Sequence, residues 1–428
     1  MDRLTRRGIL GVALATGPVL GAAQASTLPG NLPSGGPASP SDEAYWGRVA
    51  AQYDLTDEVI QLENGNWGVM SRPVLEAYER HQKMVNRRNS YYSRREYGAD
   101  LERIRARVAA NLGVAVEEIA FTRGATEALQ ILIGGYNRLK PGDTVIYADL
   151  DYDSMQTAMD WLHERRGAQV VKFGLPEPAT RQALIDAYEA VLSANPRARL
   201  LLLTQVSHRN GLRLPVAEIA ALAKARGVDV ILDAAHAWGQ VDFKLPDLGC
   251  DFVGLNGHKW IGAPIGVGVL YIRKGRVEAI DPFMGSDEYS EDDVRRRVHT
   301  GTSNMAAYLA MEDALNFHEA IGAAAKEARL TWLRRRWTEP LRGEGGIELL
   351  TPEDDSLGSA LSGFRLAGKA DGASNVALSK ALLERYGVFT VPRFGLASGA
   401  CVRATVSTFT TPAEADRLAE ALAELAKA

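Results

Sequence analysis

Residues 228–236 read Val-Asp-Val-Ile-Leu-Asp-Ala-Ala-His, a short apolar run that ends in the carboxylate of Asp233. An apolar run of this length predicts a strand over residues 228–233. A carboxylate at the end of a buried strand is costly to desolvate unless a cation lies beside it. The stretch therefore predicts an element of a buried sheet and a polar site where that element ends.

Short β-rich runs alternate with amphipathic helices from about residue 117 onwards. We expect strands at residues 118–122, 144–148, 169–173, 200–204, 228–233, 252–255 and 267–272, and helices at 126–137, 154–165, 181–194 and 216–225. This alternation predicts an α/β fold whose mostly parallel sheet is covered by helices on both faces. Ligands of such sheets bind beyond the carboxyl ends of the strands, so residues that directly follow strands are the first candidates for a site.

The pattern changes after residue 300. We expect a helix over residues 305–337 with an interruption near Gly322, and then strands at 362–366 and 401–407 and helices at 375–386 and 412–426. These elements predict a smaller α+β domain that comprises residues 42–62 and 301–428. The large domain then spans residues 63–300.

Lys259 directly follows the strand expected at residues 252–255, so it and Asp233 would lie at the same edge of the sheet. A ligand with a cationic ring nitrogen and an aldehyde would join the two side chains. Pyridoxal 5'-phosphate is such a ligand, because it forms a Schiff base with a lysine and places its ring nitrogen against an acidic group. Each residue alone also fits a structural role, Asp233 as a cap and Lys259 as a surface lysine.

Residues 122–128 read Thr-Arg-Gly-Ala-Thr-Glu-Ala, and they follow one expected strand and open a helix. Small residues at this position expose backbone N–H groups, and Thr126 adds a hydroxyl donor, which together suit a phosphate. The same segment also fits an ordinary N-terminal helix turn. The glycines at 262, 266 and 268 precede a strand, so they do not predict dinucleotide binding.

Together these segments resemble the class V aminotransferase family of fold-type-I pyridoxal phosphate enzymes, over roughly residues 60–410. The resemblance is carried by residues 123–128, 233–236, 257–262, 301–302 and 402–403. It implies a mostly parallel seven-stranded sheet with helices on both faces. Within the family the chain is similar to the isopenicillin N epimerase-like branch, and also to the exported enzyme of pyoverdine maturation.

The resemblance implies roles for the residues that hold the cofactor. Lys259 would form the aldimine and then move the Cα proton. Asp233 would pair with the pyridine nitrogen, and His236 would lie beside the phenolic oxygen. Four residues would hold the phosphate, namely Ala125, Thr126, Asn256 and His258.

Other matching residues would contact the ring, the substrate or a second subunit. Tyr152 takes the place of the aromatic residue that stacks on the pyridine ring, although it also fits a turn aromatic. Arg403 would bind the substrate carboxylate as a bidentate pair. His208 would face the pocket or cap a turn, and the mouth of the pocket would be lined by Asn66 and Trp67. Thr302 would reach the partner subunit's phosphate, which implies a homodimer with shared active sites.

One departure from the family concerns cysteine desulfurases, which carry a nucleophilic cysteine on a loop of the C-terminal domain. Residues 351–363 hold no cysteine, and Cys401 lies within an expected strand, where it predicts buried packing. We therefore do not expect desulfuration. With only Cys250 besides, the chain can form neither a disulfide framework nor a cysteine-based zinc site, and we expect no metal.

Residues 1–25 have the features of an export signal. Arg3, Arg6 and Arg7 precede a charge-free stretch at 8–22, and residues 23–25 read Ala-Gln-Ala, a small-residue cleavage site. Residues 5–10 resemble the twin-arginine pattern. The apolar stretch is too short to span a bilayer, so we expect no stable membrane anchor and a periplasmic location. The proline-rich residues 26–41 predict a disordered linker.

The chain has 428 residues and a formal net charge of −4, which gives no reason to expect a nucleic acid as partner. We expect an enzyme that transforms the amino group of an amino acid or of a peptide through a Cα carbanion. The shared residues do not choose between transamination, epimerisation and decarboxylation. The alternatives are an epimerase or racemase, a siderophore-maturation enzyme, and a binding protein that kept the fold without turnover.

Overall fold

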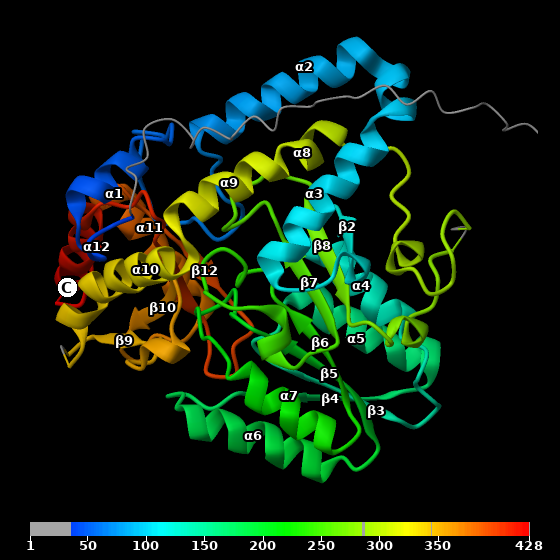
Figure 1. Ribbon diagram of the computed structural model, residues 1–428. Helices are drawn as coiled ribbons and strands as arrows, with labels where there is room; N and C mark the ends of the chain where they lie inside the picture. The colour runs from blue at the N-terminus through cyan, green and yellow to red at the C-terminus, as the bar shows by residue number, and fades with distance from the viewer. Residues whose placement is uncertain (1–35, 285–286, 344, 428) are drawn as a thin grey trace, which may run out of the picture.

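The computed structural model describes residues 36–284, 287–343 and 345–427 (Figure 1). The expected signal segment, residues 1–25, and the first part of the expected linker, residues 26–35, lie outside the described residues. The first helix, α1 (Glu43–Ala50), begins after Asp42, whose side chain accepts a hydrogen bond from the amide of Tyr45. Among the described residues, no helix combines the length and the apolar character needed to cross a membrane.

A seven-stranded sheet forms the centre of the molecule, in the order β2-β8-β7-β6-β5-β3-β4. Strand β8 runs antiparallel to both of its neighbours, and the pairs from β7 to β4 are parallel. The mostly parallel sheet predicted from the sequence is therefore confirmed. Its strands are β2 (Ile119–Thr122), β3 (Thr144–Ala148), β4 (Gln169–Phe173), β5 (Ala198–Thr204), β6 (Asp229–Asp233), β7 (Phe252–Asn256) and β8 (Gly268–Ile272).

The leucines of β5 show why this sheet needs cover on both faces. Leu200 and Leu202 belong to one buried cluster with residues of α4 (Ala125–Gly135) and α5 (Asp153–Arg166). Leu201 and Leu203 belong to the other, with residues of α6 (Arg181–Ala194) and α7 (Val216–Ala225). Alternate residues of a strand point to opposite faces, so a continuous apolar run is stable only between two helical layers (Figure 1).

Two long helices were not among the elements predicted from the sequence. Helix α2 (Arg72–Arg95) is interrupted at Asn89, whose φ is 45°, and α3 (Tyr97–Leu112) follows it. Both pack against α8 (Met305–Leu309) and α9 (Met311–Ile321), which Figure 1 shows beside α2. The expected helix at 305–337 is in fact three helices, because the chain breaks at Ala310 as well as at Gly322.

A second, antiparallel sheet lies towards the C-terminus, in the order β12-β13-β10-β9. Its strands are β9 (Ile347–Leu349), β10 (Leu361–Leu366), β12 (Val391–Arg393) and β13 (Cys401–Thr405), and its helices are α10 (Ala323–Thr338), α11 (Gly372–Tyr386) and α12 (Pro412–Leu425). The two-residue strand β1 (Ile60–Gln61) pairs with β11 (Val388–Phe389). Arg329 of α10 forms an ion pair with Glu43, so α1 packs against these C-terminal elements.

Candidate functional site

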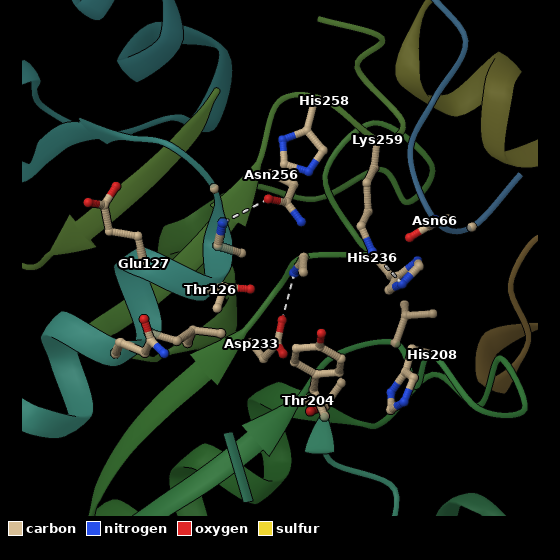
Figure 2. A pocket seen from close by; sticks show the side chains of 18 of the residues that line it. Asn66, Thr126, Glu127, Thr204, His208, Asp233, His236, Asn256, His258 and Lys259 are labelled. Atoms are coloured by element: carbon tan, nitrogen blue, oxygen red, sulfur yellow. Dashed lines mark hydrogen bonds between the residues drawn. The ribbon is translucent and has the colours of Figure 1, made fainter. Parts of the chain in front are cut away.

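A cavity of about 530 Å³ opens at the carboxyl ends of β5, β6 and β7, beside the first turn of α4 (Figure 2). This is the edge at which ligands of parallel sheets bind. The structure brings together most of the residues that the sequence analysis singled out, and the cavity is lined by Asn66, Ala125, Thr126, Tyr152, His208, Asp233, His236, Asn256, His258, Lys259 and Arg403. Other lining residues were not predicted, among them Glu127, Gln130, Thr204 and Arg393.

Asp233 ends β6 and is buried at the floor of the cavity. One of its carboxylate oxygens accepts a hydrogen bond from the amide of Ala235 at 2.9 Å, as Figure 2 shows. Burial raises the pKa of Asp233, and the Ala235 amide and the charge of Lys259 offset only part of that effect. A buried carboxylate with one oxygen free of hydrogen bonds from the described residues fits a cationic ring nitrogen in the cavity.

A second carboxylate, Asp151, lies close by. It accepts hydrogen bonds from the hydroxyl of Thr204 at 2.6 Å and from the amide of Ala148 at 2.7 Å. Burial raises the pKa of Asp151 to about 7, and the charge of Asp233 adds to the increase. Asp151 and Thr204 were not predicted, although each lies at or just after the end of an expected strand, which is the signal that could have found them.

Lys259 follows β7 and points into the cavity, with its Nζ 2.8 Å from Nε2 of His236 (Figure 2). Burial, with a smaller contribution from the charge of Arg403, lowers the pKa of Lys259 to about 7. Burial also holds the pKa of His236 well below its usual range. The backbone before Lys259 is fixed by Gly68, whose amide donates to the carbonyl of His258 at 2.8 Å. An uncharged amine is therefore held in place near neutral pH.

The first turn of α4 lies at the other end of the cavity. The sequence analysis expected the amide of Ala125 to meet a phosphate, but this amide donates to Oδ1 of Asn256 at 2.7 Å (Figure 2). That part of the prediction needs correction, since Asn256 acts by fixing the turn. The later amides of a first helical turn have no acceptor within the helix, so Thr126 offers its amide and its hydroxyl to an anion. His258 lies alongside, with Nδ1 at 3.1 Å from the carbonyl of Val267.

Gly124 precedes this turn, where a side chain would crowd two residues of the site. A Cβ at residue 124 would lie 3.2 Å from Oδ1 of Asn256 and 3.2 Å from a ring carbon of His258. The backbone of Gly268 on β8 also packs against Gly124 so closely that a Cβ at residue 268 would overlap it. The two glycines thus allow strand, helix turn and histidine to meet around one small space.

Tyr152 and His208 form one wall of the cavity. Their rings meet edge to face, with centroids 5.2 Å apart and planes at 88°. Burial lowers the pKa of His208 to about 4, although Asp153 lies 3.5 Å from its Nε2. The predicted stacking of Tyr152 on a cofactor ring stays a prediction, whereas His208 faces the pocket, which was one of the two positions expected for it.

The side chain of Arg403 is already paired, which differs from the role expected for it. Its Nη2 lies 2.5 and 2.6 Å from the two carboxylate oxygens of Glu63, and its Nη1 donates to the carbonyl of His208. Glu63 was missed because it lies 340 residues away from Arg403 in sequence, two residues after the end of the short strand β1. The one signal in the sequence that could have indicated Glu63 is its charge, within the short run of residues 60–64.

Two predicted residues lie away from the cavity. Trp67 does not line it and is 52% exposed, and its place at the mouth stays a prediction. Thr302 is exposed and also does not line it. A role for Thr302 across a subunit interface stays a prediction. In the described part of the chain no cluster of histidine, cysteine, aspartate or glutamate side chains could hold a metal ion.

Comparisons with known proteins agree with this geometry. Residues 70–418 match the family model described as Aminotransferase class-V. Isopenicillin N epimerase from Streptomyces clavuligerus is 29% identical over 395 residues, which cover 89% of this chain and 98% of that protein. A cysteine desulfurase from Pectobacterium carotovorum subsp. carotovorum is 27% identical over 382 residues, which cover 80% of this chain and 89% of that protein.

Solved structures show the same fold. The apo cysteine desulfurase from Thermococcus onnurineus NA1 superposes with a TM-score of 0.77 at 23% identity, covering 89% of this chain and 98% of that one. A C-DES K223A mutant with glycine covalently linked to its pyridoxal phosphate cofactor has a TM-score of 0.74 at 20% identity, covering 87% and 98%.

Proposed function

The chain belongs to the class V aminotransferase family of pyridoxal phosphate enzymes, and from this premise we propose that it transforms the amino group of an amino acid or of a peptide-borne amine. The proposal is carried by one observation. Lys259 and Asp233, which follow neighbouring parallel strands, line one cavity with an unused helix turn at its far end.

The residues present fit pyridoxal phosphate. Asp233 has a carboxylate oxygen for the ring nitrogen, Lys259 offers an amine, and the first turn of α4 with Thr126 suits the phosphate. The cofactor, when bound, draws electrons away from the bonds of the carbon that bears the substrate nitrogen.

The protein's own groups would then do the following. Asp233 keeps a proton on the ring nitrogen, because a buried carboxylate is most stable beside a cation. Lys259, with a pKa near neutrality, takes a proton from the carbon that bears the amine and returns it elsewhere. His236 holds the lysine amine in position from the other side.

The site to which the proton returns decides the reaction. Delivery to the cofactor carbon gives amino transfer, and delivery to the opposite face of the substrate carbon gives epimerisation. A specific observation favours epimerisation as the second candidate, because the isopenicillin N epimerases of Streptomyces clavuligerus and Amycolatopsis lactamdurans each align with 89% of this chain.

Desulfuration is not part of the proposal, although several relatives are cysteine desulfurases. That reaction needs a reactive thiolate at the site. The chain has two cysteines, both buried, and burial raises the pKa of each to about 12. A binding protein without turnover is a remoter candidate.

Two further parts of the proposal concern the cell and the assembly. The motif at residues 5–10 supports export by the twin-arginine route and a periplasmic location. Such export moves folded proteins, so the cofactor can be loaded before transport. The match of Gly301-Thr302 to the family's pattern supports a homodimer in which each subunit completes the other's site, and Thr302 is exposed, as such a contact requires.

The experiment that tests the function is exchange in D2O. The holoenzyme is incubated with a panel of amino acids and small peptides, with and without a keto acid acceptor. Deuterium at the amine-bearing carbon supports the proposal, inversion without a keto acid product identifies epimerisation, and keto acid formation identifies amino transfer. No exchange with any amine, in protein that carries the cofactor on Lys259, would favour the binding protein.

A further inference from the structure

Two arginines and one glutamate gather at one end of the cavity. Arg403 lies on β13 and Arg393 on β12, and these strands pair antiparallel with Val391 opposite Arg403. Arg393 is two residues further along β12, so both arginines project from the same face of the sheet. Glu63 lies next to β13, where it forms a bridge with Thr405, and its carboxylate contacts both guanidinium groups.

Arg403 has no room for another carboxylate. Glu63 occupies its Nη2 with both oxygens, and the carbonyl of His208 occupies its Nη1. Gly65 closes the remaining side so tightly that a Cβ there would lie 2.7 Å from Nη2. The side chain is 1% exposed. A ligand carboxylate would have to displace Glu63 from a buried ion pair in which both carboxylate oxygens contact Nη2 of Arg403.

Arg393 is different. Its Nη2 lies 3.6 Å from Glu63, its side chain is 29% exposed, and it lines the cavity. No described residue accepts a hydrogen bond from the guanidinium of Arg393, whereas in Arg403 both Nη atoms are paired and the buried Nε alone has no partner. Burial lowers the pKa of Arg393 to about 10, and the charge of Arg403 contributes. A half-buried cation without hydrogen bonds is poorly solvated, and a carboxylate ligand would offset that cost.

The neighbouring charges leave this end of the cavity positive. Arg209 is paired with Asp153, and the low pKa of His208 keeps that ring neutral at pH 7. Glu63 balances one of the two arginines that face it. One positive charge therefore remains for a ligand, and it belongs to Arg393.

We propose that Arg393 receives the carboxylate of the substrate and that Glu63 is a specificity residue that keeps a carboxylate away from Arg403. This inference rests on the proposed function and narrows its substrate class. The substrate is an amine whose carboxylate is separated from the amine-bearing carbon by at least one further carbon. Arg393 lowers the pKa of Lys259 less than Arg403 does, which agrees with a greater distance from the reacting amine.

The test titrates the holoenzyme with L-alanine, β-alanine and γ-aminobutyrate and follows the cofactor absorbance. In the wild-type protein the two longer amino acids should bind at least about tenfold more tightly than L-alanine, the factor given by one charge-assisted hydrogen bond. Arg393→Ala should lose that preference, and Arg393→Lys should recover part of it. Glu63→Gln should tighten the binding of L-alanine, because it removes the ion pair with Glu63 and leaves Arg403 available to a carboxylate.

The matched control is Arg385→Ala, which removes the same charge from the exposed face of α11 and should leave all three dissociation constants unchanged. Thermal unfolding of each variant shows whether the fold is retained. Tightest binding of L-alanine in the wild type, no spectral change with any of the three, or unchanged constants in Arg393→Ala would each overturn the inference. A different result would refute the proposed function itself, namely the absence of a covalent bond between the cofactor and Lys259.

Discussion

The amine of Lys259 lies 2.8 Å from Nε2 of His236, and burial lowers the pKa of both groups. Near pH 7 the pair therefore carries at most one positive charge, and a large share of the Lys259 side chains is uncharged. The uncharged amine is the form that attacks an aldehyde. The folded chain thus presents a nucleophile before any cofactor arrives.

Lys259→Ala should abolish the covalent bond to pyridoxal phosphate without abolishing its binding. The first turn of α4 and Asp233 remain in place, so the cofactor should still associate reversibly. Borohydride reduction followed by peptide mass spectrometry measures this, with the wild-type protein giving a cofactor-bearing peptide that contains Lys259. A reduced cofactor on any other lysine would contradict the site described above.

Asp233→Asn should keep the covalent bond but lose proton exchange at the substrate carbon. An amide accepts the hydrogen bond of Ala235 as the carboxylate does, but it cannot hold a proton on the ring nitrogen. We expect exchange in D2O to slow by about a hundredfold or more, which is roughly 2.7 kcal/mol of activation free energy. Exchange at the wild-type rate would show that Asp233 has only a structural role.

Lys326→Met should change how the free energy of unfolding depends on pH. Lys326 is buried behind the site, donates to the carbonyl of Trp260 at 2.7 Å and lies 3.3 Å from Nδ1 of His318. Burial lowers its pKa from 10.5 to about 7. Between these values the unfolded chain binds more protons than the folded one, so this lysine makes stability rise with pH.

The check is urea unfolding of both proteins, free of cofactor, at pH 7, 8 and 9. The wild-type curve should rise more steeply, by about 1.4 kcal/mol per pH unit at most, and the difference in slope should be smaller near pH 7 than at pH 9. His318 does not interfere, because its lowered pKa places its titration below this window. Parallel curves from pH 7 to 9 would mean that Lys326 is charged in the folded protein.

Mixed dimers test the shared site. Lys259→Ala subunits, combined with subunits in which Thr302 is replaced by a bulky residue such as tryptophan, should regain up to half of the activity per exchanged dimer. Each mixed dimer has one site with an intact lysine and an intact partner threonine. Mass spectrometry of the intact complex verifies exchange. Verified mixed dimers without activity, or an active monomer in sedimentation, would refute the shared site.

Replacing both Arg6 and Arg7 by lysine should leave the protein in the cytoplasm. Twin-arginine transport depends on the arginine pair in residues 5–10, whereas the general secretory route accepts lysine. Cell fractionation with immunodetection measures the distribution, and N-terminal sequencing of the exported wild type should begin at Ser26. Periplasmic delivery of the double variant would indicate the general route.

Local patterns were enough to predict the central sheet. The ends of β3, β4, α6 and α7 agree with the residues expected, because each has a clear period and turn residues on both sides. Helices α2 and α3 were missed, since the long α2 buries few apolar residues, among them Val74, Ala77 and Tyr92. Its stability comes from tertiary packing, which single-sequence periodicity does not report.

The site was predictable where it depends on strand ends and not where it depends on distant pairing. Asp233 and Lys259 meet because parallel strands end at one edge, and sequence order reveals that. The pairing of Arg403 with Glu63 joins two chain segments with no local pattern in common. The hydrogen bond from the amide of Ala125 to the side chain of Asn256 was equally hidden, because these two residues also lie in separate segments of the chain. That amide had been expected to bind a ligand.

The bond between Asn256 and the amide of Ala125 has a consequence for how the protein retains its cofactor. Asn256 ends β7, and Lys259 follows three residues later, so the turn that faces the phosphate and the amine that faces the aldehyde are anchored to one strand. The bound cofactor would then be held at two points, its phosphate and its aldehyde carbon, by groups that are anchored to the same strand. If a substrate amine displaced Lys259, the first turn of α4 would still hold the phosphate, and the lysine would rebind from within the same complex at high effective concentration. The protein would therefore keep its cofactor even while the bond between the cofactor and Lys259 is broken during turnover.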